Sequence, residues 1–285
     1  MIIVKIIGGL GNQMFQYALG RNLANYLGAE LVLDISAYDR YATRKYCLND
    51  YNIQEKILDR SVLKKYNSKL FRLFDLFHFS VYSRNIILDK SLKFDPKILK
   101  ITDNKYLAGY WQSEKYFENI PEIIREEYKP KSAPDRLNRK YLNMIQKCHS
   151  VSLHVRRGDY VSDRSANSVH GVCGPSYYEN ALKIIEKKTK DFTLFIFSDD
   201  MPWVKKNLIF NHTVVYVEGN GPEKSYEDLR LMSCCEDNII ANSSFSWWGA
   251  WLNIKPNKIV IAPKQWFRDP KMDSSDMIPK KWKRI

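Results

Sequence analysis

The sequence predicts an α/β protein with parallel sheets in two domains. At its start an apolar, largely β-branched run at residues 2–7 precedes a glycine-rich loop, a helical pattern and a second strand-like run. In its C-terminal half, five strand-like runs alternate with helical segments, which is typical of parallel strands joined by helices. Between these regions lies Lys129–Pro134, which has two prolines and no apolar anchor. These observations predict domains at residues 1–134 and 135–285.

The length and composition agree with this fold class. A chain of 285 residues, 45% hydrophobic and 27% charged, can build the cores of two medium domains, which excludes disordered and fibrous proteins. No apolar run reaches the roughly 18 residues of a membrane span, and Lys5 interrupts the apolar start, so neither a transmembrane helix nor a secretory signal is predicted. Five cysteines without metal-ligand spacing favour reduced thiols and a cytoplasmic location.

The charge balance raises three hypotheses about partners. Lys and Arg number 45 against 32 Asp and Glu, which gives a net charge of +13 and suits a nucleotide, a nucleic acid or an anionic membrane face. A Lys-rich solvated surface explains the same balance. A basic nucleic-acid-binding protein is therefore an alternative, but the sequence has no pattern of a known nucleic-acid-binding module, so no nucleic-acid partner is expected.

The N-terminal elements follow from local pattern. Residues 2–7 predict a buried strand that ends at Gly8, and apolar residues at intervals of four predict a helix from Asn12 to Gly28. Residues 31–33 predict the next strand. Residues 35–128 have weak periodicity, and we predict mixed helix and loop there.

The loop GGLGNQ lacks the third glycine of a dinucleotide-binding fingerprint, because Met14 stands at that position. A glycine-rich turn still allows the backbone to approach a phosphate or a sugar closely.

Polar residues follow the strands predicted in the C-terminal half. These strands are residues 151–155, 192–197, 213–217, 238–241 and 258–262. Because ligands bind beyond the carboxyl ends of parallel strands, the residues that follow them should converge on one site. They are Arg156–Asp159, Ser198–Asp200, Glu218–Asn220 and Asn242–Ser246.

Two adjacent arginines give this site its chemistry. The guanidinium groups of Arg156 and Arg157 have forked donors that fit a diphosphate, although a surface ion pair with Asp159 explains them too. His154 points to the same face of its strand as Arg156, and a lone histidine there is more often a core residue than a ligand contact.

Hydroxyl and carboxyl groups on two later segments fit an anion or nucleotide site. The turn at Asn242–Ser246 combines hydroxyls with a predicted helix N-terminus, which binds anions; ordinary capping by Ser244 or Ser246 is equally consistent. Asp228 lies three residues after Ser225 and either caps a helix or accepts hydrogen bonds from a purine edge.

The acidic pair Asp199 and Asp200 suggests either a metal site or a cap for the helix that begins near Pro202. No cluster of further metal ligands accompanies the pair, so no metal is predicted.

Five segments together resemble glycosyltransferase family 11, the α-1,2-fucosyltransferases. They are GGLGNQMFQYALGRNLA, HVRRGDYV, HGVCGPSYYENAL, FIFSDD and EDLRLMSCCEDNIIANSSFSWWGAWL, and they occur in order through most of the chain. The pattern HxRRxD is shared with other families that use GDP-fucose, whereas GGLGNQMFQYA and SSFSWWGAWL are more specific. The resemblance implies a GT-B-like fold, with two Rossmann-like domains facing across a cleft and the donor held mostly by the C-terminal domain, residues 135–285. We hypothesise that the N-terminal domain, residues 1–134, is the acceptor side.

The resemblance also implies an activity. It is the metal-independent, inverting transfer of L-fucose from GDP-β-L-fucose to the 2-hydroxyl of a terminal β-galactoside in surface-glycan synthesis, with no cofactor besides this donor substrate. A fucosyltransferase of another linkage is the alternative. For a lipid-linked acceptor, the basic surface would hold this cytoplasmic enzyme peripherally on the inner face of the membrane.

Matching the motifs gives each residue an implied role. Arg156 would hold the donor β-phosphate while Arg157 supports the loop, His154 would lie against the nucleoside, and Asp228 would read guanine. Phosphate would be bound by Ser243, Ser244 and Ser246, and covered from the N-terminal domain by Gly9, Gly11 and Asn12. Asp159 and His170 are the candidates for a catalytic base, and the sequence selects neither; a base that is absent, or the donor phosphate in that role, is also consistent.

Overall fold

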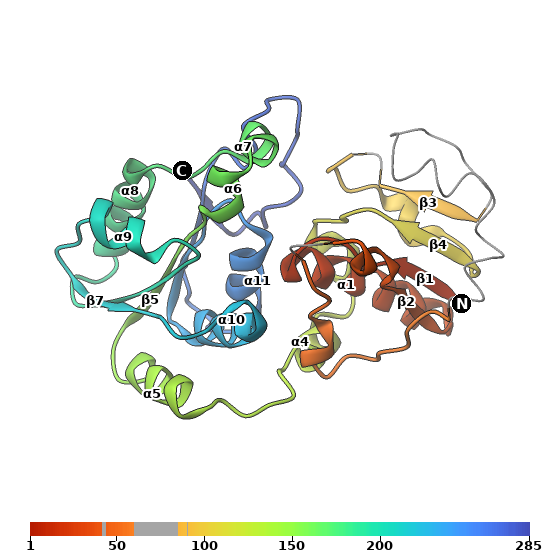
Figure 1. Ribbon diagram of the computed structural model, residues 1–285, viewed down its shortest axis with the longest axis horizontal. Coiled ribbons are helices and arrows are strands. Elements are labelled where there is room, and N and C mark those ends of the chain that lie inside the picture. The colour runs from red at the N-terminus through yellow and green to blue at the C-terminus, as the bar shows by residue number, and fades with distance from the viewer. Residues whose placement is uncertain (42–43, 60–84, 90) are drawn as a thin grey trace. The chain divides into compact units, whose positions relative to one another are not determined.

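The computed structural model describes residues 1–41, 44–59, 85–89 and 91–285, which form two compact units (Figure 1). Unit 1 is Met1–Lys129 and unit 2 is Pro130–Ile285. The division falls within the proline-containing segment, five residues before the predicted one. Within the described ranges, no helix combines the length and the apolarity needed to cross a membrane.

Unit 1 has a parallel four-stranded sheet in the order β2-β1-β4-β3. Its elements are β1 (Ile2–Lys5), α1 (Leu10–Leu27), β2 (Leu31–Asp34), β3 (Ile86–Leu88), β4 (Lys105–Ala108) and α4 (Pro121–Glu127), with short 3₁₀ turns at Ser36–Asp39, Leu48–Asp50, Pro96–Lys100 and Glu114–Tyr116. The predicted first strand, helix and second strand are confirmed. The prediction of helix and loop for residues 35–128 is wrong at β3 and β4, since runs of three and four residues are too short to show a strand period.

Unit 2 has a parallel six-stranded sheet in the order β10-β9-β8-β5-β6-β7. Its strands are β5 (Ser150–Val155), β6 (Thr193–Ser198), β7 (Thr213–Tyr216), β8 (Asp237–Ile239), β9 (Val260–Ala262) and β10 (Lys283–Arg284). Its helices are α5 (Arg136–Ile145), α6 (Gly158–Ser162), α7 (Arg164–His170), α8 (Pro175–Glu186), α9 (Met201–Asn207), α10 (Ser225–Cys234) and α11 (Ser244–Leu252). All five predicted strands are present, and the predicted α/β class with two parallel-sheet units is confirmed.

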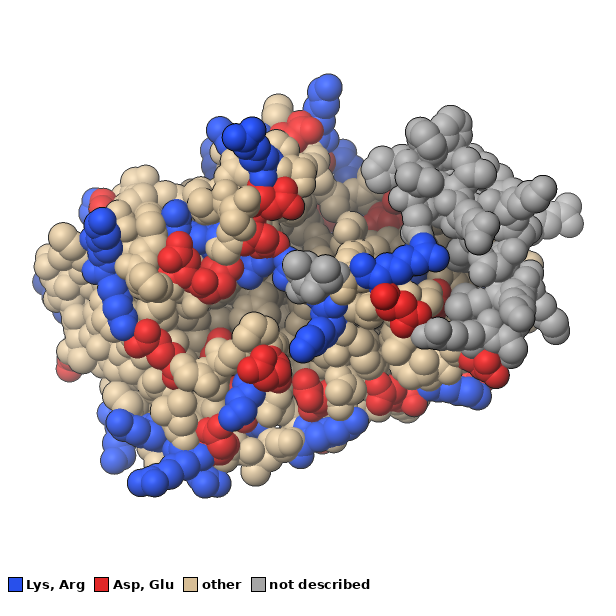
Figure 2. All heavy atoms as spheres, viewed as in Figure 1, with Lys and Arg blue, Asp and Glu red and all other residues tan. Residues whose placement is uncertain are grey.

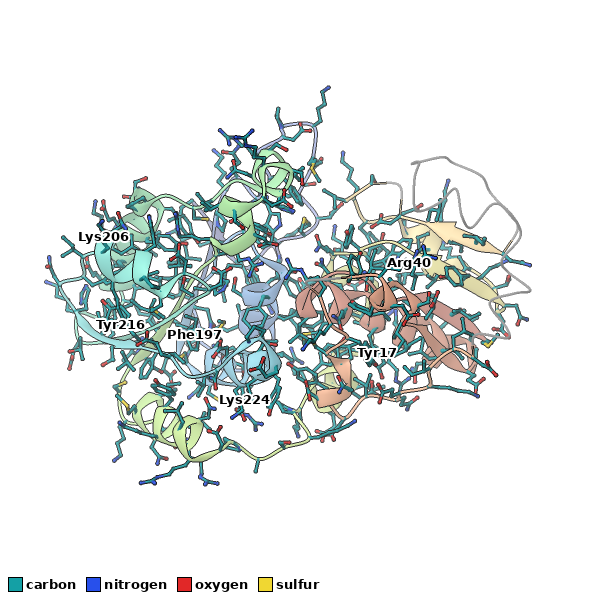
Figure 3. All side chains as sticks on the ribbon, viewed as in Figure 1. Tyr17, Arg40, Phe197, Lys206, Tyr216 and Lys224 are labelled. Carbon is teal, nitrogen blue, oxygen red and sulfur yellow. The ribbon has the colours of Figure 1, made fainter. Side chains whose placement is uncertain are left out.

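Helices cover both faces of the unit 2 sheet. Along β6, Leu194 and Ile196 join one buried apolar cluster, whereas Phe195 and Phe197 join another on the opposite face. Figure 3 shows Phe197 within the body of unit 2. A sheet that is buried on both faces leaves its strand ends as the places where polar side chains can meet a ligand.

The strand order defines a ligand edge in each unit. In unit 2 the chain leads from β5 to β6 and β7 on one side, whereas β8, β9 and β10 lie on the other side. In unit 1, β1 leads to β2 on one side, and β4 and β3 lie on the other. Open α/β sheets bind ligands beyond the carboxyl ends of strands at such a switch point. The expected ligand edges are therefore the ends of β5 and β8 and the ends of β1 and β4.

Candidate functional site

Two arginines follow β5 at the ligand edge of unit 2. The Arg156 guanidinium donates to Asp159 at 2.5 Å and forms an ion pair with Asp199 at 2.8 Å. The Arg157 guanidinium donates to Asp200 at 3.1 Å and lies 3.8 Å from the centre of the Trp203 ring. The ion pair with Asp159 that the surface interpretation expects is present. Both guanidinium groups are also fixed in orientation by side chains from the next strand.

Register explains why the acidic pair after β6 meets these arginines. Val155 pairs with Ser198, so the residues that follow the two strands are neighbours. Asp199 also accepts from the Arg157 backbone N–H at 2.8 Å. A Cβ at Gly158 would lie 2.4 Å from the Asp199 carboxylate, so a larger residue there would displace the carboxylate that holds Arg156. Asp200 accepts from the Trp203 backbone N–H and caps α9, as one of the two sequence interpretations predicts.

His154, the penultimate residue of β5, is a buried, neutral imidazole. Burial, and secondarily the charge of Arg156, lowers its pKa to about 3. Its ring lies 5.8 Å from the Phe245 ring in the first turn of α11, and its Nδ1 atom is buried without a hydrogen-bond partner. A buried nitrogen of this kind costs free energy unless something binds it, which fits the predicted ligand contact better than a satisfied core residue.

The N-terminus of α11 lies at the end of β8, next to the end of β5. The N-cap is Ser243, whose hydroxyl accepts from the Phe245 backbone N–H at 3.3 Å. The interpretation of Ser244 or Ser246 as the cap is therefore wrong: Ser244 is the first helical residue, and the Ser246 hydroxyl donates to the Ser243 carbonyl. Backbone N–H groups at this end carry the positive end of the helix dipole, which attracts anions.

Asp159, Tyr160 and His170 gather around Arg156. The His170 and Tyr160 rings stack at 4.5 Å with an interplanar angle of 2°, and the Arg156 guanidinium lies 5.3 Å from the Tyr160 ring. Burial lowers the pKa of His170, the charge of Asp159 raises it, and the charge of Arg156 lowers it further. The three groups are therefore electrostatically coupled. Asn242, at the end of β8, donates to the His170 carbonyl at 2.9 Å and ties this group to the second strand of the switch point.

Asp228 lies in the first turn of α10, but it does not cap that helix. The N-cap is Lys224, and no side chain caps there, so the predicted pairing of Ser225 with Asp228 is absent. Instead the Asn220 amide donates to the Asp228 carboxylate at 2.8 Å. The pKa of Asp228 is raised to about 7, mainly by burial. The charge of Glu227 also raises this pKa, whereas the Asn220 hydrogen bond lowers it.

Asn220 is itself held by α5, through a reciprocal pair of amide hydrogen bonds with Asn138, each 2.9 Å long. Lys224, labelled in Figure 3, adds a link from the start of α10 to Asp135 at 3.0 Å. A buried carboxyl that is positioned by a chain of amides at a strand end is a candidate for a ligand-reading group.

In unit 1 the glycine-rich loop lies between β1 and α1, as predicted. Gly8 has φ +78°, which favours glycine, and Gly9 is the N-cap of α1, so Gly11 and Asn12 belong to the first helical turn. The Asn12 side-chain oxygen Oδ1 accepts from the Gln112 side-chain amide at 2.6 Å. The loop is thereby connected to the segment that follows β4, the other strand of this unit's switch point.

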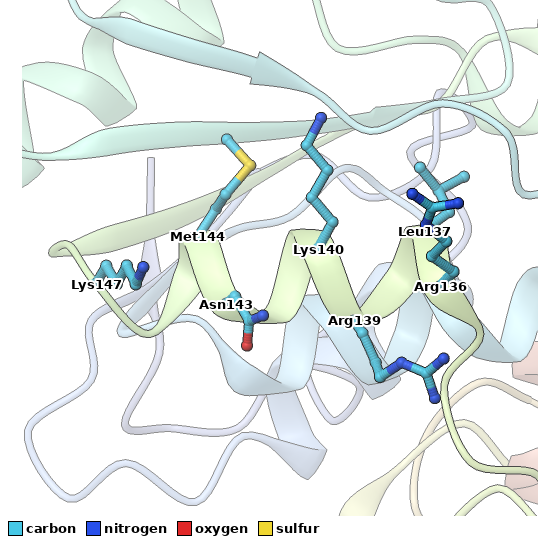
Figure 4. Close-up of a pocket in the computed structure, with 7 residues that line it drawn as sticks. All are labelled: Arg136, Leu137, Arg139, Lys140, Asn143, Met144 and Lys147. Atoms are coloured by element: carbon cyan, nitrogen blue, oxygen red, sulfur yellow. The ribbon is translucent and has the colours of Figure 1, made fainter.

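A groove runs along α5 (Figure 4). It is lined by Arg136, Leu137, Arg139, Lys140, Asn143, Met144 and Lys147. Four of these side chains are cationic and none is acidic. Elsewhere on the face drawn in Figure 2, basic and acidic side chains are interspersed.

Sequence reasoning missed several residues that complete the site. The sequence suggests Asp199 and Asp200 as metal ligands or caps and not as partners of the arginines. It places Asn220 and Asn242 at the site without a specific contact, and it gives Tyr160 no role. Their signal was their place directly after a strand or beside the arginine pair.

The sequence profile of the family described as "Glycosyl transferase family 11" matches residues 1–285. The chain belongs to this family. Membership favours the enzyme over the nucleic-acid-binding alternative and confirms the family that the motifs resemble.

Three relatives illustrate the range of the family. An alpha-1,2-colitosyltransferase of Escherichia coli is 36% identical over 295 residues, covering 100% of this chain and 99% of that protein. The O-antigen biosynthesis glycosyltransferase WbnK of Escherichia coli is 34% identical, with 91% and 93% covered. The galactoside 2-alpha-L-fucosyltransferase Sec1 of Mus musculus is 25% identical, with 88% and 64% covered.

A solved structure resembles the fold at low sequence identity. A GDP complex of Arabidopsis thaliana FUT1 aligns with a TM-score of 0.53 at 8% identity, covering 99% of this chain and 75% of that one.

Proposed function

We propose that this glycosyltransferase moves L-fucose from GDP-β-L-fucose to the 2-hydroxyl of a terminal β-galactoside, with inversion, in surface-glycan synthesis. The observation that carries the proposal is the meeting of Arg156, Arg157 and the α11 N-terminus at the switch point of the unit 2 sheet. The mouse galactoside 2-alpha-L-fucosyltransferase supports the sugar and the linkage, and the O-antigen biosynthesis glycosyltransferase WbnK supports the setting in glycan synthesis.

The chemistry follows from where charge develops. As the bond between fucose and the β-phosphate breaks, negative charge grows on the departing GDP. Arg156 and the first N–H groups of α11 are fixed donors that stabilise this charge in the transition state without reorganising. Because arginine supplies the positive charge, we propose transfer without a metal ion. Gly9, Gly11 and Asn12 would cover the diphosphate, and Asp228 would accept hydrogen bonds from guanine.

Inversion requires the acceptor hydroxyl to attack from the face opposite GDP and to lose its proton. Two groups near Arg156 are candidates for the base. Asp159 already binds the Arg156 guanidinium at 2.5 Å, which gives it a positioning role as well. His170 has a lowered pKa, so its imidazole is neutral near pH 7 and able to take a proton. His170→Asn and Asp159→Asn separate the two. A general base must be unprotonated to act, so loss of the true base removes the fall of kcat at acidic pH.

The full-length colitosyltransferase relative supports a second donor, GDP-colitose. Colitose is fucose without its 3-hydroxyl, so the two donors differ by one polar group. A site that binds this hydroxyl discriminates strongly against the deoxy sugar, whereas an apolar site at this position does not. Comparing kcat/KM for the two donors decides between them.

One assay tests the proposal directly. The chain is incubated with GDP-fucose, GDP-colitose or UDP-galactose and a panel of terminal β-galactosides, and the linkage of any product is determined by NMR. We expect a new 1,2-linkage from a GDP-sugar and none from UDP-galactose. A product of another linkage, or no product from either GDP-sugar, would overturn the proposal.

We further propose that the enzyme works peripherally at the inner face of the membrane on a lipid-linked acceptor. The cationic groove of α5 is the contact that supports this, because its Lys and Arg side chains fit anionic headgroups.

A further inference from the structure

The ligand edge of unit 1 carries a group of tyrosines that the proposed donor site does not use. Tyr38 lies in the turn after β2, and its ring centre is 5.6 Å from that of Tyr41 and 6.2 Å from that of Tyr46. Tyr110 follows β4. Tyr41 and Tyr110 are each 42% exposed, although most large aromatic side chains described in this unit are buried. We call Tyr38, Tyr41 and Tyr110 the tyrosine patch.

The members of the patch are neighbours of one another and of the glycine-rich loop. Burial raises the pKa of Tyr110, and the adjacent Tyr41 raises it further. The Tyr38 hydroxyl donates to the Gly8 carbonyl at 2.8 Å. The Arg44 guanidinium lies beside the same loop, 3.5 Å from where a Cβ of Gly9 would stand. The patch therefore borders the loop at the carboxyl ends of β1, β2 and β4.

The backbone that presents Tyr110 is fixed and strained. Trp111, the next residue, has φ +54°, an outlier for a bulky residue. The Asp89 carboxylate compensates by accepting from the N–H groups of Tyr110 and Trp111 at 3.2 and 3.0 Å, and Gln112 binds Asn12. Strain that is held in place by several hydrogen bonds is concentrated at functional sites. Its effect here is to keep a half-exposed aromatic ring at the ligand edge.

Such a surface has a defined chemistry. A pyranose ring presents C–H groups on one face, which pack on an aromatic ring, and hydroxyls at its rim, which bind phenol and guanidinium groups. A patch of tyrosines beside an arginine fits a neutral sugar better than a phosphate, because aromatic faces carry partial negative charge. Its place at the β1 and β4 switch point gives the sugar a site in unit 1 that is separate from the donor site of unit 2.

We propose that the tyrosine patch, with Arg44, binds the galactosyl end of the acceptor glycan. This inference rests on the proposed function and deepens it by naming the acceptor subsite. Tyr110 and Tyr41 supply stacking surface, while Arg44 and the phenol hydroxyls bind the sugar hydroxyls. Acceptor choice then depends on residues of unit 1, and donor choice depends on residues of unit 2.

The test compares Tyr110→Ala, Tyr41→Ala and Tyr110→Phe with the control Tyr26→Ala, whose tyrosine is 76% exposed near the end of α1. The Ala variants should raise the KM for a β-galactoside about tenfold, the size of one lost aromatic stack, and leave the KM for GDP-fucose and the slow hydrolysis of donor alone within twofold. Tyr110→Phe should retain most acceptor affinity. An unchanged acceptor KM, or an equal rise in the donor KM, would overturn the proposal.

A binding experiment keeps the subsite testable apart from turnover. Saturation-transfer NMR detects methyl β-galactoside or lactose on the chain without donor. The subsite is supported if the wild type and Tyr26→Ala bind the galactoside and Tyr110→Ala does not. This holds even if the wild-type chain transfers no fucose, and in that case only the proposed function fails. No binding by the wild type, or equal binding by all variants, contradicts the subsite.

Discussion

If Asp228 reads guanine, donor affinity must depend on pH near neutrality. Only the ionised carboxylate accepts hydrogen bonds from both guanine N–H donors, and burial raises the pKa of Asp228 to about 7. The carboxyl is then about 10% ionised at pH 6 and about 90% ionised at pH 8. Since apparent affinity scales with the competent fraction, the Kd for GDP-fucose should fall about tenfold between these values.

The assay is calorimetric titration of GDP-fucose, whose esterified diphosphate does not titrate in this range. Asp228→Asn should weaken binding at pH 8 by about 10- to 100-fold, as expected for a lost charged hydrogen bond, and should give a flat pH profile. Asn220→Ala removes a hydrogen bond that lowers this pKa, so it should move the midpoint to higher pH. The control Glu223→Gln, on an exposed turn, should retain the wild-type profile. A flat wild-type profile, or the same profile in Asp228→Asn, refutes guanine reading by Asp228.

The same pKa has a consequence for stability. A folded-state pKa raised above the unfolded value means that the folded chain favours the neutral carboxyl. The contribution of Asp228 to the free energy of unfolding is therefore fully present below about pH 4 and is lost as pH rises through about 7. Asp228→Asn should remove this part of the pH dependence, measured as the urea midpoint between pH 5 and pH 8. An identical slope in wild type and variant would rule the effect out.

Three further predictions concern the arginines, the metal and the membrane. Arg156→Ala should lower kcat by about 10²–10³ with the fold intact, because it removes a fixed donor to the departing phosphate. The kcat of Arg156→Lys should lie between those of the wild type and the Ala variant, because lysine keeps the charge without the forked donors. Near-normal turnover of the Ala variant would disprove the role. Activity should persist in EDTA, and a loss that Mg²⁺ restores would argue for a metal. Replacing Arg139 and Lys140 by Gln should weaken sedimentation with anionic vesicles about 30-fold at low salt, and equal sedimentation would exclude α5 as the contact.

The sequence carried much of the donor site but little of unit 1 beyond its first three elements. Buried runs such as Val151–Val155 followed by polar residues are visible from composition alone, and parallel strands bring their ends together. By contrast, β4 is four residues long and begins with a lysine, so its central place beside β1 depends on pairing across a hundred residues. The pairing of Arg156 with Asp199 depends likewise on the register of β5 against β6, which no local pattern specifies.

The partners of side-chain hydrogen bonds were the other feature that the sequence could not predict. The interpretation of Asp228 as a cap followed from its spacing to Ser225, yet Asn220, from the loop after β7, binds the carboxylate instead. Which hydroxyl caps α11 was also undecided, since three serines stand within four residues of one another. Which side chain caps a helix depends on local backbone geometry, which the spacing of residues in the sequence does not specify.

The most direct test of the central idea is a crystal structure of the chain with GDP-fucose bound. We expect the β-phosphate oxygens within hydrogen-bond distance of the Arg156 guanidinium and the first N–H groups of α11, at the ends of β5 and β8. A diphosphate bound in the α5 groove, or anywhere away from these strand ends, would contradict the account.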